Sequence, residues 1–227
     1  MINSPKAAFS ERLERWQNRV REPALSVLLL GQVVVLFVGV PLRSAHVLNF
    51  AAMDSLQILL LLISYFALPL RSKARLLILI CLVPILWLLF MGPVPHWGLM
   101  LHTGATLGIT VAVGRVVFGA QRISRHQLLG AVVVYLNLAL LFTGAFNSVN
   151  WAVPGAFTNG TNVPVQSDEL VYFSLTTLTS TGYGDILPVH PAARSLANLE
   201  SVIGQLFLAI FLARLVSQHS TEEKPRQ

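Results

Sequence analysis

The sequence predicts an all-α membrane protein with six transmembrane helices, on three observations. Hydrophobic residues make up 54% of the 227 residues and charged residues only 11%, a balance unlike that of soluble globular domains. Six apolar segments follow one another along the chain. The 16 Lys and Arg outnumber the 10 Asp and Glu, but they lie between the apolar segments, which favours membrane topology over nucleic-acid binding as their role.

The apolar segments are long enough, or nearly so, to cross a bilayer, for which a helix needs roughly 17–25 mostly apolar residues. They cover residues 24–40, 47–70, 76–91, 97–118, 128–146 and 196–216. The third is the shortest and contains Pro84, which neighbouring helices can accommodate within lipid. The fourth is the most polar and includes His102 and Arg115.

The basic residues support this count of helices. If the chain begins in the cytoplasm and crosses six times, 14 of the 16 Lys and Arg fall on the cytoplasmic side, and only Arg43 and Arg194 fall outside. This asymmetry follows the positive-inside rule. The sequence therefore predicts that both termini are cytoplasmic.

Residues 1–23 are expected to form a cytoplasmic segment that is too polar for a cleaved signal peptide. Phe9, Leu13, Trp16 and Val20 recur at helical spacing, with arginines between them. This pattern fits an amphipathic helix on the inner leaflet, where each Lys or Arg contributes about 1 kcal/mol. It fits a solvated charged tail equally well.

The most informative segment, residues 167–188, reads SDELVYFSLTTLTSTGYGDILP. Its core, TLTSTGYGD at residues 177–185, closely resembles the signature sequence of the potassium channel family. The resemblance implies a re-entrant pore helix and a filter loop between the fifth and sixth transmembrane helices. It divides the chain into a four-helix, voltage-sensor-like membrane domain (24–126), a pore domain (127–217) and a short cytoplasmic tail (218–227).

In this family the selectivity filter is built from rings of backbone carbonyls that replace the water shell of K⁺. The resemblance implies a filter formed by Thr179, Ser180, Thr181, Gly182, Tyr183, Gly184 and Asp185. It further implies that K⁺ is held by the carbonyls of Ser180, Thr181, Gly182 and Tyr183, and by the Ser180 hydroxyl. Gly182 and Gly184 are suited to the unusual backbone angles that turn successive carbonyls the same way.

The flanking residues fit a short helix that points at this filter. Ser167 is expected to be the N-cap of the pore helix, with Asp168 and Glu169 favourable in its first turn. By resemblance, Tyr183 packs against the pore helix and Asp185 lies at the outer mouth.

The segment also departs from the family pattern. Ser180 and Thr181 stand where relatives usually have Thr followed by Val or Ile, so Thr181 adds a hydroxyl where an apolar contact is common. Tyr172 and Phe173 replace tryptophans found in many relatives. Thr176 stands where some relatives carry a buried glutamate, which leaves Asp185 without that partner.

Two residues of the last helix are candidates for gating or filter support. Glu200 is a charge within the membrane, where such residues are usually functional or paired. We expect it either to hydrogen-bond behind the filter, for example to a pore-helix threonine, or to face the outer vestibule. Gly204 is either a gating hinge or a site of close helix packing.

Voltage dependence is expected to be weak or absent. A voltage sensor needs several arginines in its fourth helix, and here Arg115 is the one within the apolar segment. Each charge that crosses the membrane field is worth about 2.3 kcal/mol per 100 mV. Asp54 could be the acidic partner of Arg115, or it could form a structural hydrogen bond to Gln32 or Gln57.

The sequence thus predicts one subunit of a homotetrameric potassium channel in a lipid bilayer, expected in a bacterial inner membrane. K⁺ is the permeant ion; we expect no organic cofactor, nucleic acid or small-molecule substrate. A non-selective cation channel and a non-conducting regulatory subunit remain alternatives. An intramembrane enzyme built on His96, His102 and Asp54 is disfavoured, because no nucleophile motif or metal-ligand spacing accompanies these residues.

Overall fold

The computed structural model of the chain describes residues 26–45, 47–48, 55–56, 59–60, 62–63, 96–119, 125–161 and 163–222. In this part of the chain the fold is helical, apart from one short pairing of two strands. Three of its helical segments are long and apolar enough to cross a membrane: Ser26–Ser44, Gln127–Ala152 and Pro191–Ser217. A shorter apolar stretch covers Thr103–Gly119. The chain is therefore a mostly helical membrane protein.

The first helix runs from residue 26 to Ser44, so the predicted end at Val40 is too early. It includes a π-helical turn, η1 (Val35–Gly39), and finishes as α2 (Val40–Ser44), which contains Pro41. A proline ring clashes with the carbonyl four residues earlier in a regular helix. The wider π turn directly before Pro41 lets the helix continue past it.

The second and third predicted helices, 47–70 and 76–91, lie largely outside the described residues, as do residues 1–23 and Asp54. Val47 and Leu48 form a bend in which both N–H groups donate to Leu42 O, so the second helix does not begin at Val47. Within that segment the described helical residues are 55–56, 59–60 and 62–63.

The fourth predicted helix is α5 (His96–Gly119), which extends one residue beyond the expected bounds at each end. The fifth is α6 (Arg125–Ala152), which continues well past the predicted end at Phe146. The helix therefore includes residues 147–152, and it ends only before Val153. Asn147 Nδ2 donates to Thr143 O at 2.9 Å. This polar side chain therefore hydrogen-bonds to a carbonyl of its own helix and does not end the helix.

The last helix, α8 (Pro191–Glu222), begins five residues before the predicted start at 196 and ends beyond 216. Proline is well suited to the first position of a helix, where its missing N–H would be unpaired in any case. The N–H of Ala192 is satisfied by His190 Nδ1 at 3.3 Å.

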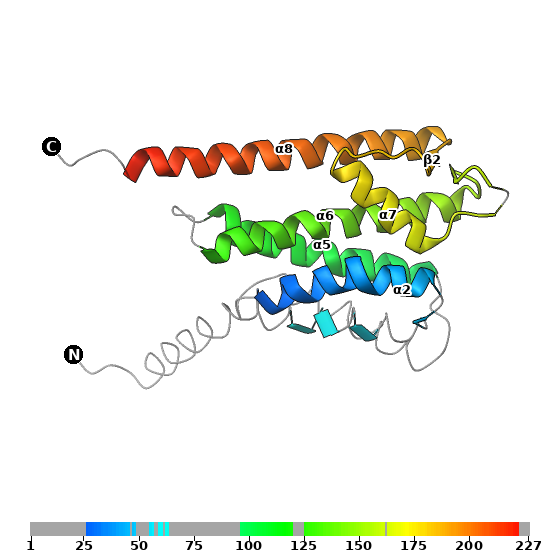
Figure 1. The fold of residues 1–227 in the computed structure, drawn as a ribbon, viewed down its shortest axis with the longest axis horizontal. Coiled ribbons are helices and arrows are strands. Elements are labelled where there is room, and N and C mark those ends of the chain that lie inside the picture. The colour runs from blue at the N-terminus through cyan, green and yellow to red at the C-terminus, as the bar shows by residue number, and fades with distance from the viewer. Residues whose placement is uncertain are drawn as a thin grey trace.

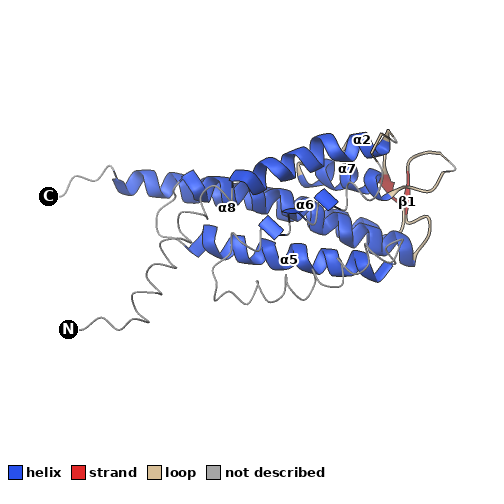
Figure 2. Ribbon diagram, turned by 90° about the horizontal axis from the view of Figure 1, so that it is seen from below, coloured by secondary structure: helices blue, strands red, loops and turns tan. Residues whose placement is uncertain are grey.

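Between α6 and α8 lie α7 (Ser167–Leu178) and two short strands, β1 (Phe157–Thr158) and β2 (Leu187–Pro188). The strands pair antiparallel, with Phe157 opposite Pro188. Figures 1 and 2 show α5, α6 and α8 side by side, with α7 inclined between α6 and α8 at one end. The 12 residues of α7 span about 18 Å, which is less than the roughly 30 Å of a bilayer core.

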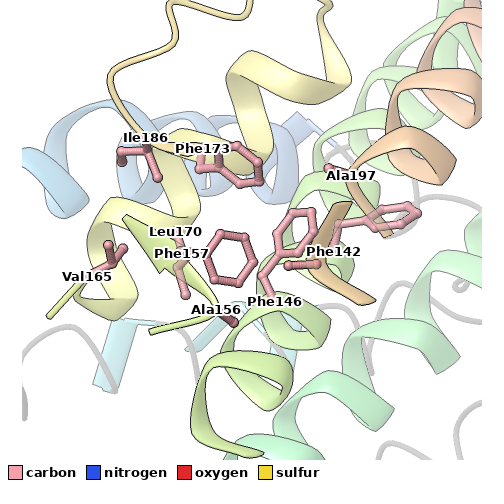
Figure 3. Packing of buried hydrophobic residues seen from close by; sticks show 10 residues of the cluster. Phe142, Phe146, Ala156, Phe157, Val165, Leu170, Phe173, Ile186 and Ala197 are labelled. Carbon is pink, nitrogen blue, oxygen red and sulfur yellow. The ribbon is translucent and has the colours of Figure 1, made fainter. Parts of the chain in front are cut away.

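Two clusters of buried side chains hold these helices together. One joins the first helix to α5 and α6; its members are Leu28, Ala105, Ile109, Ala112, Val113, Val117, Ala131, Val133 and Val134. The second surrounds the N-terminal half of α7 and includes four phenylalanines, of which Phe146, Phe157 and Phe173 pack against one another (Figure 3). Each pair of these three rings is arranged edge to face, with centroids 5.1 to 5.5 Å apart. The second cluster fixes α7 to α6 and to the strand pair.

Polar contacts add two further links between helices. Gln32 Nε2 of the first helix donates to Asn137 Oδ1 of α6 at 2.5 Å. The hydrogen bond that the structure gives for Gln32 is thus to Asn137, whereas the sequence offered Gln32 as a partner of Asp54. Arg214 of α8 donates from Nη1 to Val117 O of α5 at 3.3 Å. Its guanidinium carbon lies 5.8 Å from the centroid of the Phe118 ring.

Candidate functional site

The candidate site begins where α7 is fixed at its N-terminus. Gln166, not Ser167, is the N-cap, because the Glu169 side chain turns back and Oε2 accepts from Gln166 N at 2.6 Å. Ser167 Oγ instead donates to Asn147 Oδ1 of α6 at 2.6 Å. Asp168 accepts a hydrogen bond from Ser44 Oγ of α2. The first turn of α7 is thus bonded to two neighbouring helices.

At its other end, α7 passes directly into the segment 179–185. The N–H of Ser180 donates to Thr177 O at 3.0 Å. The N–H groups of Thr181 and Gly182 both donate to Thr176 O, at 2.8 and 3.3 Å. Thr176 therefore supports this segment through its carbonyl, because its hydroxyl donates to Phe173 O instead, at 3.0 Å.

The backbone of the segment alternates in handedness. Ser180, Gly182 and Gly184 have φ angles of 55°, 55° and 79°, whereas Thr181 and Tyr183 between them do not have positive φ. Within the described residues Ser180 is the one non-glycine with positive φ. This conformation costs a residue with a Cβ roughly 1–3 kcal/mol, and such strain is typical of functional sites. Glycine adopts it without a Cβ clash.

Ser180 is held by polar side chains of α8. Gln205 Nε2 donates to Ser180 Oγ at 2.8 Å, and Ser201 Oγ lies 3.4 Å from the same oxygen. All residues from Thr179 to Asp185 are exposed in the single chain. The segment is therefore fixed on the side of α7 and α8 and open on the other.

The Thr181 hydroxyl has a polar partner in place of an apolar contact. Thr181 Oγ1 lies 2.8 Å from Thr179 Oγ1, which itself donates to Leu175 O at 2.7 Å. Because the Thr179 proton is used in that bond, Thr181 is the donor between the two threonines. The extra hydroxyl thus ties the segment to the end of α7.

Tyr183 packs against α7 through Tyr172, with the two rings stacked at 6.2 Å and 3°. The pKa of the Tyr172 hydroxyl is raised above its usual value, first by desolvation and then by the nearby Asp185 carboxylate. Asp185 itself accepts a hydrogen bond from Ile186 N through Oδ1 at 3.1 Å. Phe173, the residue after Tyr172, lies in the buried cluster around Phe146 and does not contribute to the contact between the two tyrosines.

Gly204 lies where α8 approaches the end of α7 most closely. A Cβ added at Gly204 would lie 2.2 Å from Leu178 O, so only glycine fits without a shift. The same carbonyl accepts a hydrogen bond from Tyr135 Oη of α6 at 3.2 Å. Of the two expectations for Gly204, the structure favours close packing, and α8 continues through this position as an α-helix.

Glu200 lies behind α7 and not in an outer vestibule, since its side chain is fully buried. Its Oε1 lies 2.5 Å from Ser174 Oγ, so the partner on α7 is a serine and not the expected threonine. Arg115, the remaining candidate, is exposed on α5. No described hydrogen bond joins it to Glu200, to Gly204 or to the segment 179–185.

Sequence reasoning missed Gln205, Ser201 and Ser174 as parts of this site. Ser201 and Gln205 are four residues apart, a spacing that puts both on one face of a helix. That spacing is the signal in the sequence that could have identified Ser201 and Gln205 as a pair. Nothing in the sequence showed which face would meet Ser180. The part of the chain that the structure describes contains no cluster of metal-ligating His, Cys, Asp or Glu.

Comparison with known proteins identifies this region. Residues 128–220 match the family model described as "Ion channel". Two pore potassium channel c of Oryza sativa subsp. japonica is 35% identical over 88 residues, which cover 38% of this chain and 19% of the relative. Inward rectifier potassium channel Kirbac3.1 of Paramagnetospirillum magnetotacticum is 32% identical over 72 residues, 32% of this chain and 21% of the relative.

Residues 128–220, from α6 through most of α8, therefore form an ion channel domain in a membrane protein. This region of the chain is similar in sequence to the two potassium channels. The matched segments span about a fifth of the length of each of the two relatives.

Proposed function

We propose that this chain is one subunit of a potassium-selective channel and that four copies surround a single pore. K⁺ would shed its water and pass along the carbonyls of residues 180–183, with the Ser180 hydroxyl at the inner end. The main support for this proposal is that the sign of φ alternates along residues 180–184. Alternating backbone handedness turns successive carbonyls to one side of the segment. The potassium channel names of the relatives support the same proposal.

A homotetramer follows from the geometry of a single segment, which cannot surround an ion by itself. The exposure of residues 179–185 supports an assembly in which other copies lie on their open side. So do the exposed apolar side chains of α8, which are Leu199, Val202, Leu206, Leu208, Ile210, Leu212 and Val216. Native mass spectrometry of the purified protein tests this stoichiometry, and any mass other than that of four chains contradicts it.

The proposed topology has six spans, with α7 re-entrant between the fifth and sixth and both termini in the cytoplasm of a bacterium. The length of α7 supports this, because it is too short to span the bilayer. Single cysteines introduced by Thr221→Cys and Gly160→Cys in a Cys81→Ala background test it. An impermeant thiol reagent added to right-side-out vesicles is expected to label position 160 and not position 221; the reverse result contradicts the topology.

The function is tested by measuring the reversal potential of purified protein in planar bilayers under a K⁺-to-Na⁺ gradient. A reversal near the potassium equilibrium value is the expected result. A reversal near zero with robust current would assign a non-selective cation channel, with Thr181 as the first residue to change. Absence of current from monodisperse tetramers would favour the non-conducting regulatory subunit.

A further inference from the structure

Glu200 is a buried acidic residue that the proposed conduction pathway does not use. Its side chain and that of Ser174 are both fully buried, on α8 and α7 respectively. Ser174 Oγ lies 2.5 Å from Glu200 Oε1 and 2.7 Å from Ala139 O of α6. Three helices therefore meet at one serine hydroxyl.

The number of protons at this junction determines its chemistry. The Ala139 carbonyl can only accept, and Ser174 has a single hydroxyl proton. Both distances are at or below the usual value of about 2.7–2.8 Å for O–H···O bonds, so one shared proton does not account for two such contacts. If Ser174 donates to Ala139 O, the proton between Ser174 and Glu200 must come from the carboxyl group.

The surroundings of Glu200 agree with this count. Its other oxygen, Oε2, is buried and has no hydrogen-bond partner within the described residues, and no described cation bonds to the carboxyl group. Tyr135 of α6 gives it no bond, because that hydroxyl donates to Leu178 O. A buried carboxylate with this environment would be costly in a membrane, whereas an acid leaves only a carbonyl-type oxygen unpaired.

We infer that Glu200 is a neutral carboxylic acid that donates its proton to Ser174 and thereby positions α7. Its role in positioning rests on the proposed channel function. Glu200 lies one helical turn before Gly204, where α8 touches the Leu178 carbonyl. Near that contact, the carbonyls of Thr176 and Thr177 accept hydrogen bonds from the N–H groups of residues 180–182. The donated proton thus fixes the helix end from which the filter begins.

The protonation state is tested by infrared spectroscopy of purified protein at neutral pH, which requires no current. The wild-type spectrum minus that of E200Q is expected to contain the carbonyl band of a carboxylic acid, shifted in D₂O. In S174A the band is expected to move to higher frequency, because the acid loses its acceptor. A difference spectrum with carboxylate bands in place of the acid band would overturn the inference.

The positioning role is tested by conduction of monodisperse variants. Gln at position 200 keeps an N–H donor for Ser174, so E200Q is expected to retain K⁺ current within about threefold of wild type. E200L removes the donor and is expected to lose current by about tenfold or more. Equal losses in both variants would overturn the role of the donated proton. If the wild type itself does not conduct, the channel proposal fails while the infrared result still decides the protonation state.

Discussion

The side-chain amide of Gln205 donates to the hydroxyl oxygen of Ser180 at 2.8 Å, joining α8 to the residue at the inner end of the proposed filter. The same hydroxyl is expected to contact K⁺ in the channel. An oxygen that accepts an amide hydrogen bond has less capacity left for a cation. Gln205 is therefore expected to tune ion binding at that end.

Gln205→Leu should strengthen cation binding at Ser180, because the competing hydrogen bond is lost. A net hydrogen bond is worth about 1 kcal/mol, which corresponds to roughly fivefold tighter block by internal Ba²⁺, a divalent cation close to K⁺ in size. Block is measured from K⁺ currents in bilayers at several Ba²⁺ concentrations. Ser201→Ala is the matched control, since its 3.4 Å contact is long and should matter little. Weaker block in the leucine variant would contradict this account.

Thr181→Val should shorten the lifetime of the conducting state without abolishing selectivity. Valine has nearly the same shape but cannot donate to Thr179, so the filter loses its side-chain tie to the end of α7. The expected result is faster decay of K⁺ current during sustained recording, with an unchanged reversal potential. A reversal potential displaced toward that of Na⁺ would show instead that the hydroxyl contributes to ion selection.

Gly204→Ala should destabilise the protein, because the added methyl would overlap the Leu178 carbonyl. Overpacking of this kind typically costs about 1–3 kcal/mol. Thermal unfolding in detergent measures the loss. Gly104→Ala is the control, since a Cβ there would have no neighbour within 4 Å and the substitution should be neutral or stabilising. Full stability of Gly204→Ala combined with altered opening would support the hinge instead.

Phe157→Ala should loosen the outer end of α7, because Phe157 packs edge to face against both Phe146 and Phe173. Replacing a buried phenylalanine by alanine usually costs roughly 3–5 kcal/mol. The thermal midpoint in detergent is expected to fall by several degrees at least. Val163→Ala, at a side chain that is 62% exposed, should leave the midpoint almost unchanged.

Arg115→Gln should leave the voltage dependence of conduction essentially as in the wild type. Arg115 is the one Lys or Arg within α5, and one charge per subunit supplies at most about 2.3 kcal/mol per 100 mV. The slope of conductance against voltage is the measurement. A marked flattening of that slope in the variant would mean that Arg115 does move through the membrane field.

Sequence reasoning succeeded where a pattern depends on local composition. The apolar stretch of α5 has bounds that hydropathy predicts to within one residue at each end. The signature around Gly182 and Gly184 predicted the positions of positive φ at both glycines. These features depend on the residues themselves and on their immediate neighbours, so the sequence carries them.

Features that depend on packing between distant segments were harder to predict. α6 continues through Asn147 because that side chain bonds to its own helix and to Ser167, which lies 20 residues later. The serine that meets Glu200 was not distinguishable from nearby threonines, because the relative rotation of α7 and α8 decides which hydroxyl faces the carboxyl group. The same rotation brings Gln205 to Ser180.

The contact of Arg214 with Val117 and Phe118 gives the chain a direct mechanical connection between its two halves. α5 and α8 are separated in sequence by all of α6 and α7, yet their C-terminal ends are fastened to each other. Load applied to the end of α5 therefore reaches α8 in a single step. α5 precedes residues 128–220, so a displacement of its C-terminal end caused by swelling or thinning of the bilayer would reach α8 of the ion channel domain through the contacts of Arg214.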